Sequence, residues 1–165
     1  LWNPAMTTAA TPQLIKVKMA GIEYGRSPDC LETLLGSCVG VAVWDRSSKL
    51  GGLAHVVLPE SHGRPGPPGK FADKAVAEIK RQLIAKGAVP GKLTAKIAGG
   101  STMFGQRSER DVGEKNCYAV REALRLLGIR ITAEHVGGNQ GRIIRFNLRD
   151  GSVEVLVARQ KVATL

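Results

Sequence analysis

Apolar positions recur along the chain with two spacings, one typical of strands and one of helices. Residues 34–44 and 52–58 are almost continuously apolar and rich in valine, which is typical of buried strands. The polar residues 45–49 separate these segments, so together they predict a hairpin. Further strands are predicted at residues 14–19, 93–97 and 129–133, and a second hairpin at residues 142–148 and 153–158.

Two segments instead have helical spacing, at residues 72–86 and 113–127. The apolar residues of the first share one face, and they are Ala72, Ala75, Val76, Ile79 and Leu83. Gly87 and Gly128 follow the two segments and suit helix C-terminal ends. Many strands and two helices that do not alternate strictly favour an α+β fold. We expect a layered, mostly antiparallel β-sandwich with two main helices packed on one side.

The composition is that of an ordinary globular protein, since 43% of the 165 residues are hydrophobic and 23% are charged. We expect residues 1–12 to form a flexible tail and residues 13–165 a single domain. No apolar run approaches the roughly 20 residues of a membrane-spanning helix, and the first residues lack the layout of a signal peptide. We therefore expect a cytoplasmic protein without membrane insertion.

The formal net charge of +10 is concentrated in one part of the chain. Residues 1–60 carry five basic and five acidic side chains, whereas residues 61–165 carry nineteen and nine. A basic surface attracts acidic partners, which include nucleic acids, anionic lipids and acidic protein surfaces. Binding of nucleic acid is disfavoured, because single-strand binders stack bases on exposed aromatic rings. Only 4% of the residues of the whole chain are aromatic.

Cofactor and metal sites find no support in the residue spacing. The segment 63–71 is rich in glycine, but it lacks the Walker spacing and its prolines remove N–H donors that would hold phosphate. The cysteines and histidines have no metal-ligand spacing, and they are Cys30, Cys38, Cys117, His55, His62 and His135. We expect neither a cofactor nor a metal ion.

Cys38 is the first candidate for chemistry, because glycines flank it in Gly36-Ser37-Cys38-Val39-Gly40. This pattern imitates the nucleophile elbow of hydrolases, but the elbow requires a following helix, and here the residues after it continue as a strand. A thiol in an apolar strand is also a common inert packing residue. Cys38 alone therefore leaves a nucleophile and a core residue as open alternatives.

His55 strengthens the case for a nucleophile. A hairpin folded at residues 45–49 pairs positions whose numbers sum to about 94, which places His55 opposite position 39 and within a residue of Cys38. Facing residues of antiparallel strands have Cβ atoms about 5 Å apart, close enough for an imidazole to accept the thiol proton. The resulting thiolate–imidazolium pair is an activated nucleophile.

The order of motifs along the chain resembles the CheD family, the chemoreceptor glutamine deamidases of bacterial chemotaxis. The resemblance is carried by Leu35–Val41 and Lys49–Pro59 and continues through Lys70–Asp73, Lys96–Phe104, Gly113–Asn116 and Gly137–Arg142. It covers most of the chain from about residue 13 to residue 157. It implies hydrolysis of glutamine carboxamides on receptor cytoplasmic helices, without a cofactor.

The resemblance also assigns roles to residues. Cys38 would be the nucleophile and His55 the general base and later the acid. The family uses a threonine upstream of the cysteine, for which Thr33 is the candidate. The family position is expected six residues before the cysteine, where this chain has Glu32, so the third group is either Thr33 or a neighbour. His135 stands where an acidic residue is expected, and we interpret it as a surface histidine.

Two other functions compatible with these residues stay open. The same thiol and imidazole could hydrolyse glutamate methyl esters, because an ester is an easier acyl donor than an amide. The resemblance also implies a CheC-type phosphatase as a partner, so the chain could act mainly as an adaptor in chemotaxis. The backbone N–H groups near Ser37, Cys38 and Val39, or near Gly52 and Leu53, are the candidate oxyanion donors.

Overall fold

The computed structural model describes residues 10–103 and 111–165. Within these residues it contains ten strands, two α-helices and one short 3₁₀ helix. The strands are β1 (Leu14–Lys16), β2 (Ile22–Arg26), β3 (Cys30–Leu35), β4 (Val39–Asp45), β5 (Leu50–Val56), β6 (Leu93–Gly99), β7 (Arg130–Val136), β8 (Arg142–Asn147), β9 (Val153–Val157) and β10 (Gln160–Thr164). The helices are α1 (Ala72–Ala85), α2 (Val112–Leu126) and the 3₁₀ helix η1 (Pro90–Lys92).

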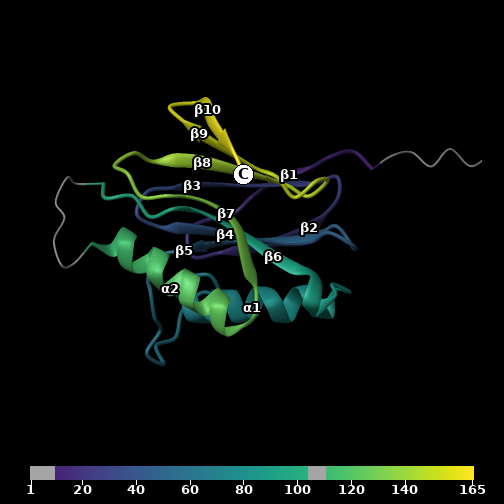
Figure 1. Ribbon diagram of the computed structural model, residues 1–165, viewed down its shortest axis with the longest axis horizontal. Helices are drawn as coiled ribbons and strands as arrows, with labels where there is room; N and C mark the ends of the chain where they lie inside the picture. Colours follow the sequence, from purple (N-terminus) through teal and green to yellow (C-terminus); the bar gives the residue numbers. More distant parts are fainter. Residues whose placement is uncertain (1–9, 104–110) are drawn as a thin grey trace, which may run out of the picture.

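The strands form two five-stranded sheets that are stacked face to face (Figure 1). The first sheet has the order β1-β3-β8-β9-β10 and the second the order β2-β5-β4-β6-β7. Only β1 with β3 and β6 with β7 pair in parallel, and the other pairings are antiparallel. Both helices cover the outer face of the second sheet. The predicted α+β sandwich with two helices on one side is therefore confirmed.

Two hydrophobic cores hold these layers together. The inter-sheet core includes Leu31 and Leu35 of β3, Leu53 of β5, and Ile144 and Phe146 of β8. The helix-side core lies between α1, α2 and the opposite face of the second sheet. Alternating residues of β3 and β8 thus face inward or outward, because side chains alternate along a strand. This alternation decides which candidate residues reach the site.

The helices agree with their sequence pattern. The buried residues of α1 are the five predicted from the spacing, namely Ala72, Ala75, Val76, Ile79 and Leu83. Gly87 and Gly128 follow the helix ends with φ values of +110° and +71°, which glycine adopts more readily than other residues. The N-terminus of α2 is capped by the side chain of Asp111, which accepts a hydrogen bond from the N–H of Glu114.

The predicted continuous strand at residues 34–44 is wrong, because the chain leaves the first sheet after Leu35 and enters the second at Val39. Residues 36–38 form the crossing between the sheets. The predicted hairpin after it is correct, since β4 pairs with β5. Strands β2 and β10 have no counterpart in the prediction, and of β3 the prediction included only Leu34 and Leu35.

The predicted flexible tail, residues 1–12, falls mainly on residues 1–9, which lie outside the described residues, as does Phe104. Residues 10–12 are exposed and precede β1. That residues 13–165 form one domain stays a prediction. Among the described helices, none is long and apolar enough to cross a membrane.

Candidate active site

Cys38 lies at the point where the chain crosses from one sheet to the other. Its carbonyl oxygen accepts a hydrogen bond from the N–H of Gly100 (2.8 Å), and the carbonyl of Gly36 accepts one from the N–H of Ser101 (3.0 Å). The end of β6 therefore fixes residues 36–38 from one side. For the N–H of Cys38 itself, no acceptor is found among the described residues. A backbone donor next to the sulfur is thus left unpaired.

His55 lies on β5, directly opposite Gly40 of β4. The predicted register is therefore wrong by one residue, since paired positions sum to 95 rather than 94. Cys38 lies two residues before Gly40, in the crossing segment and outside β4, and its side chain belongs to the inter-sheet core. His55 also points between the sheets, since it meets Thr33 of the opposite sheet. A Cβ at position 40 would lie 2.6 Å from Cδ1 of Ile144, so β4 passes close to β8 of the other sheet at Gly40.

Thr33 completes the constellation from the opposite sheet. Leu31, Thr33 and Leu35 alternate with Glu32 and Leu34, and the first three face the inter-sheet core. The Thr33 hydroxyl lies 2.8 Å from Nδ1 of His55, whereas Glu32 forms an ion pair with Arg145 (2.7 Å). Of the two positions considered for the third group, the structure therefore brings Thr33 to the histidine and directs Glu32 elsewhere.

The hydrogen bonds of Thr33 fix the position of the proton on His55. The Thr33 hydroxyl donates to the carbonyl oxygen of Val17 (2.8 Å), which can only accept. With its single proton used there, the hydroxyl accepts from Nδ1–H of His55. The lone pair of the imidazole then lies on Nε2, which is buried and has no hydrogen-bond partner among the described residues. His55 is thus arranged to accept a proton at Nε2.

Burial keeps both reactive groups neutral. Cys38 is 8% exposed and His55 is 4% exposed. Burial raises the pKa of the Cys38 thiol and lowers the pKa of His55. A preformed thiolate–imidazolium pair is therefore disfavoured, and Nε2 forms no hydrogen bond with the sulfur. A reaction of this thiol would therefore need proton transfer to the imidazole during the attack on a substrate.

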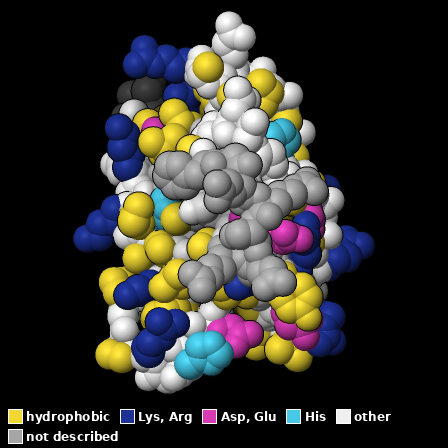
Figure 2. Space-filling view, turned by 90° about the vertical axis from the view of Figure 1, so that its left-hand side faces the viewer, with side chains coloured by type: hydrophobic (Ala, Val, Ile, Leu, Met, Phe, Trp, Pro, Cys, Tyr) yellow, Lys and Arg dark blue, Asp and Glu magenta, His cyan; other side chains and the backbone are white. Residues whose placement is uncertain are grey.

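Exposed apolar side chains lie near the crossing segment. The Met103 side chain comes within 3.4 Å of where a Cβ on Gly36 would lie, and it is partly exposed. Met19 is also exposed and precedes Ala20, whose N–H bonds the carbonyl of His55 (3.1 Å). Figure 2 shows hydrophobic side chains gathered on this end of the molecule, with Lys and Arg along both flanks.

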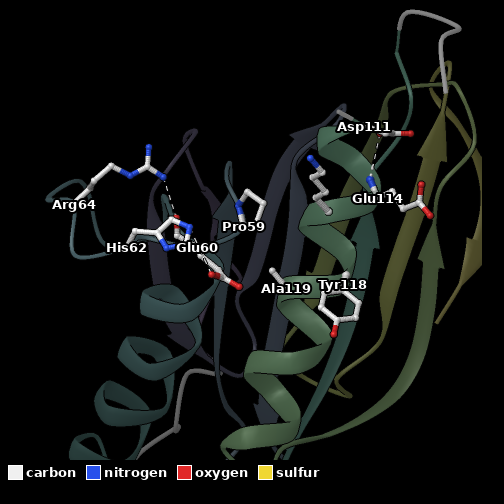
Figure 3. A pocket seen from close by; sticks show the side chains of 9 residues that line it. Pro59, Glu60, His62, Arg64, Asp111, Glu114, Tyr118 and Ala119 are labelled. Carbon is white, nitrogen blue, oxygen red and sulfur yellow. Dashed lines mark hydrogen bonds and ion pairs between the residues drawn. The ribbon is translucent and has the colours of Figure 1, made fainter. Parts of the chain in front are cut away.

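One surface pocket lies elsewhere, between α2 and the loop that precedes α1 (Figure 3). It has a volume of about 610 Å³, and Glu60, His62 and Arg64 face Tyr118 across it. None of Cys38, His55 and Thr33 lines this pocket. The three candidate residues therefore lie outside this pocket, at the crossing between the sheets.

His135 is not a plain surface histidine, contrary to the interpretation of the sequence. It is half-buried, and its Nδ1 accepts a hydrogen bond from Nη1 of the buried Arg142 (2.8 Å). Burial, and secondly the charge of Arg142, lower the pKa of His135. Its neighbour Arg142 also donates to Ser101 Oγ (2.8 Å), which links this histidine to the segment that fixes Gly36.

The remaining cysteines and histidines do not assemble into a metal site. Across residues 10–103 and 111–165, no cluster of three or more His, Cys, Asp or Glu side chains suits a metal ion. Cys117 is buried on α2 and Cys30 is half-buried at the start of β3. Sequence reasoning missed one buried polar residue that contacts the crossing segment, Asn116, which the helical pattern did not distinguish.

The chain was compared with known proteins. The family model described as "CheD chemotactic sensory transduction" matches residues 57–157. Three curated relatives are named probable chemoreceptor glutamine deamidase CheD. The protein of Methanococcus vannielii is 46% identical over 86% of this chain and 94% of its own length. The protein of Moorella thermoacetica is 43% identical over 90% of this chain and 93% of its own length. The protein of Clostridium acetobutylicum is 37% identical over 86% of this chain and 89% of its own length.

The fold and the crossing segment define an α+β sandwich with a thiol and a histidine between its sheets. The chain belongs to the CheD family, because the family model matches more than half of it and the curated relatives align over most of it. Among solved structures, a hypothetical protein YfiH of Bacillus licheniformis has a TM-score of 0.45 and 16% identity, covering 69% of this chain and 51% of that chain.

Proposed function

We propose that the chain hydrolyses glutamine side chains of chemoreceptors to glutamate, with Cys38 as nucleophile, His55 as general base and acid, and Thr33 as the residue that orients His55. The names of the curated relatives support the reaction and the substrate. One observation carries the mechanism: the Thr33 hydroxyl accepts a hydrogen bond from Nδ1–H of His55, which leaves Nε2 unprotonated and, among the described residues, without a hydrogen-bond partner.

In the first half of the proposed reaction, the Cys38 sulfur attacks the carboxamide carbon while its proton passes to Nε2 of His55. The carbonyl oxygen becomes an oxyanion, for which the unpaired N–H of Cys38 is the candidate donor. The imidazolium then gives its proton to the amide nitrogen, the C–N bond breaks, and ammonia leaves. The product of this half is a thioester on Cys38.

In the second half, water attacks the thioester carbon and transfers a proton to the neutral imidazole. The C–S bond breaks, and the imidazolium returns the proton to the sulfur. Glutamate is released and the enzyme regains its resting state, with water as the co-reactant. Gly52 and Leu53 are unsuitable as oxyanion donors, because both lie within the ladders that join β5 to β2 and β4.

The small exposure of Cys38 supports a substrate with a slender side chain. Glutamine is unbranched and can carry its carboxamide to a residue that is only 8% exposed. The exposed Met103 beside Gly36, and Met19 next to Ala20, support a substrate that brings apolar side chains beside the glutamine, as an amphipathic helix does. Receptor cytoplasmic helices are our proposed substrate, and a cytoplasmic location follows from it.

The proposal is tested by incubating the purified chain with receptor cytoplasmic fragments and searching for peptides whose mass rises as an amide becomes an acid. We expect conversion by the wild type and none by Cys38→Ala or His55→Ala. Release of ammonia distinguishes this reaction from methyl-ester hydrolysis, which releases methanol. Unchanged conversion by Cys38→Ala would exclude the thiol mechanism.

An adaptor role through a CheC-type phosphatase is the second proposal that the family suggests. It makes a different prediction for the same variant. An adaptor keeps partner binding and signalling without the thiol, so full chemotactic function of cells carrying Cys38→Ala would favour it over the deamidase.

A further inference from the structure

The amide of Asn116 is a buried polar group that the proposed reaction does not use. Asn116 lies on α2 with 0% exposure, and its Nδ2 donates to the carbonyl oxygens of Ser37 (3.1 Å) and Val57 (2.9 Å). Its Oδ1 has no hydrogen-bond partner among the described residues. A leucine would fill a similar volume without burying an unpaired carbonyl. The amide is therefore explained by its two N–H donors rather than by packing.

The two acceptors stand just beyond the end of the ladder that joins β4 and β5. The last backbone pair of that ladder is Val39 with Val56. Ser37 precedes the candidate nucleophile by one residue, and Val57 follows His55 by two. The side chain of Asn116 thus bridges the residues that flank β4 and β5, at the end of the ladder next to Cys38.

Backbone hydrogen bonds do not join the two strands at this point. The N–H of Val57 donates to the carbonyl of Lys70 (3.0 Å), and the carbonyl of Cys38 accepts from Gly100 of the loop after β6. Among the described residues, the Asn116 amide is what connects Ser37 with Val57. Because the two protons of an amide have a fixed angle, the bridge sets the separation of the two carbonyls.

We infer that Asn116 is a positioning residue, whose amide holds the Cys38 segment beside β5 so that the thiol proton can reach His55 Nε2 during attack on a substrate. This inference rests on the proposed function, since it assigns Asn116 a role in the Cys38–His55 reaction. Gly100 and Ser101 fix the same segment from the side of β6, so Asn116 supplies the restraint on the side of β5.

The first test measures deamidation by Asn116→Leu, which keeps the volume and removes both donors. We expect kcat to fall about tenfold or more while KM stays within about twofold, because the substrate still binds but proton transfer is misaligned. The matched control is Val120→Ala. Val120 lies on the same helix and is equally buried, and its substitution leaves both hydrogen bonds of the Asn116 amide in place. Thermal unfolding of both variants separates misalignment from general destabilisation.

The second test needs no receptor and follows alkylation of Cys38 by iodoacetamide, with each cysteine quantified by peptide mass. His55→Ala defines the rate of the unassisted thiol. We expect Cys38 of Asn116→Leu to react at that rate across pH 6–9. In the double variant with Asn116→Leu and His55→Ala, we expect Cys38 to react no more slowly than in His55→Ala. Asn116→Ala serves where Asn116→Leu does not fold, because alanine also removes both donors and adds no bulk.

The outcomes separate this inference from the proposed function. Wild-type alkylation kinetics and a wild-type kcat in Asn116→Leu would overturn the positioning role while leaving the deamidase intact. A fall in kcat equal to that of Val120→Ala would also overturn it. Absence of deamidation and of His55-dependent alkylation in the wild type would overturn both.

Discussion

Replacing Thr33 by valine tests the tautomer on which the proposed mechanism depends. Valine has nearly the same shape as threonine, so the substitution removes the hydroxyl and little else. Two buried groups then lose their partner: the carbonyl of Val17 and the Nδ1–H of His55. Each stranded group costs about 1–3 kcal/mol, so we expect the free energy of unfolding to fall by on the order of 3 kcal/mol.

The effect on catalysis follows from the same bond. Without an acceptor at Nδ1, the His55 proton moves to Nε2 or the ring rotates, and either change removes the base from its position. If the free-energy preference for the tautomer with Nε2 unprotonated falls by about 1.4 kcal/mol, the rate falls about tenfold. We therefore expect kcat of Thr33→Val to fall by about tenfold or more, measured by mass spectrometry of a receptor fragment.

Thr33→Ser is the matched control, because serine keeps the hydroxyl and loses a methyl group. We expect its kcat to remain within about threefold of the wild type. Thermal unfolding is measured for both variants under the assay conditions. The reasoning is refuted when Thr33→Val is less stable but keeps a wild-type kcat, since the hydroxyl would then serve the fold alone.

Three further predictions concern pH and salt. Because burial lowers the pKa of His55 and the base must be neutral, we expect kcat/KM to rise with pH through a midpoint below the usual 6.5 of histidine; a midpoint above 6.5 would contradict it. The buried Asp45 accepts hydrogen bonds from Ser47, Ser48 and Val89, which hold its pKa at about 2 against an ordinary 3.8. This stabilisation is present above pH 3.8 and is lost as the pH falls towards 2. Asp45→Asn should therefore lower the free energy of unfolding at pH 7 by on the order of 2 kcal/mol, and the difference from the wild type should shrink in acid. Unfolding titrations that show the same difference in acid as at pH 7 would contradict this prediction. Finally, the excess of basic residues in 61–165 predicts weaker binding of acidic receptor fragments as salt increases, and an affinity independent of salt would remove this role of the charge.

The helices show how far local pattern alone reaches. Helical periodicity places side chains on one face whatever the rest of the chain does, so Ala72 to Leu83 predicted the buried face of α1 correctly. The exposed edge strand β10 gave no such signal. Its residues are mostly exposed, and its pairing with β9 defines it as a strand.

The candidate site divides in the same way. The sequence by itself determined that Cys38 and His55 belong to neighbouring segments and that the turn at residues 45–49 brings these segments together, because a hairpin is a local structure. It also determined the family. It left the break after Leu35 undetected, since three small residues, 36–38, interrupt the apolar stretch too briefly to mark a crossing between sheets.

The tertiary structure decided which groups meet. Thr33 rather than Glu32 reaches His55 because β3 belongs to the opposite sheet, and a shift of one residue would exchange the two faces. The register of β4 and β5 places His55 opposite Gly40, two residues after Cys38, rather than opposite position 39. Asn116 reaches the crossing segment from a helix about eighty residues away in sequence. Such contacts depend on how layers stack, and no local pattern contains that information.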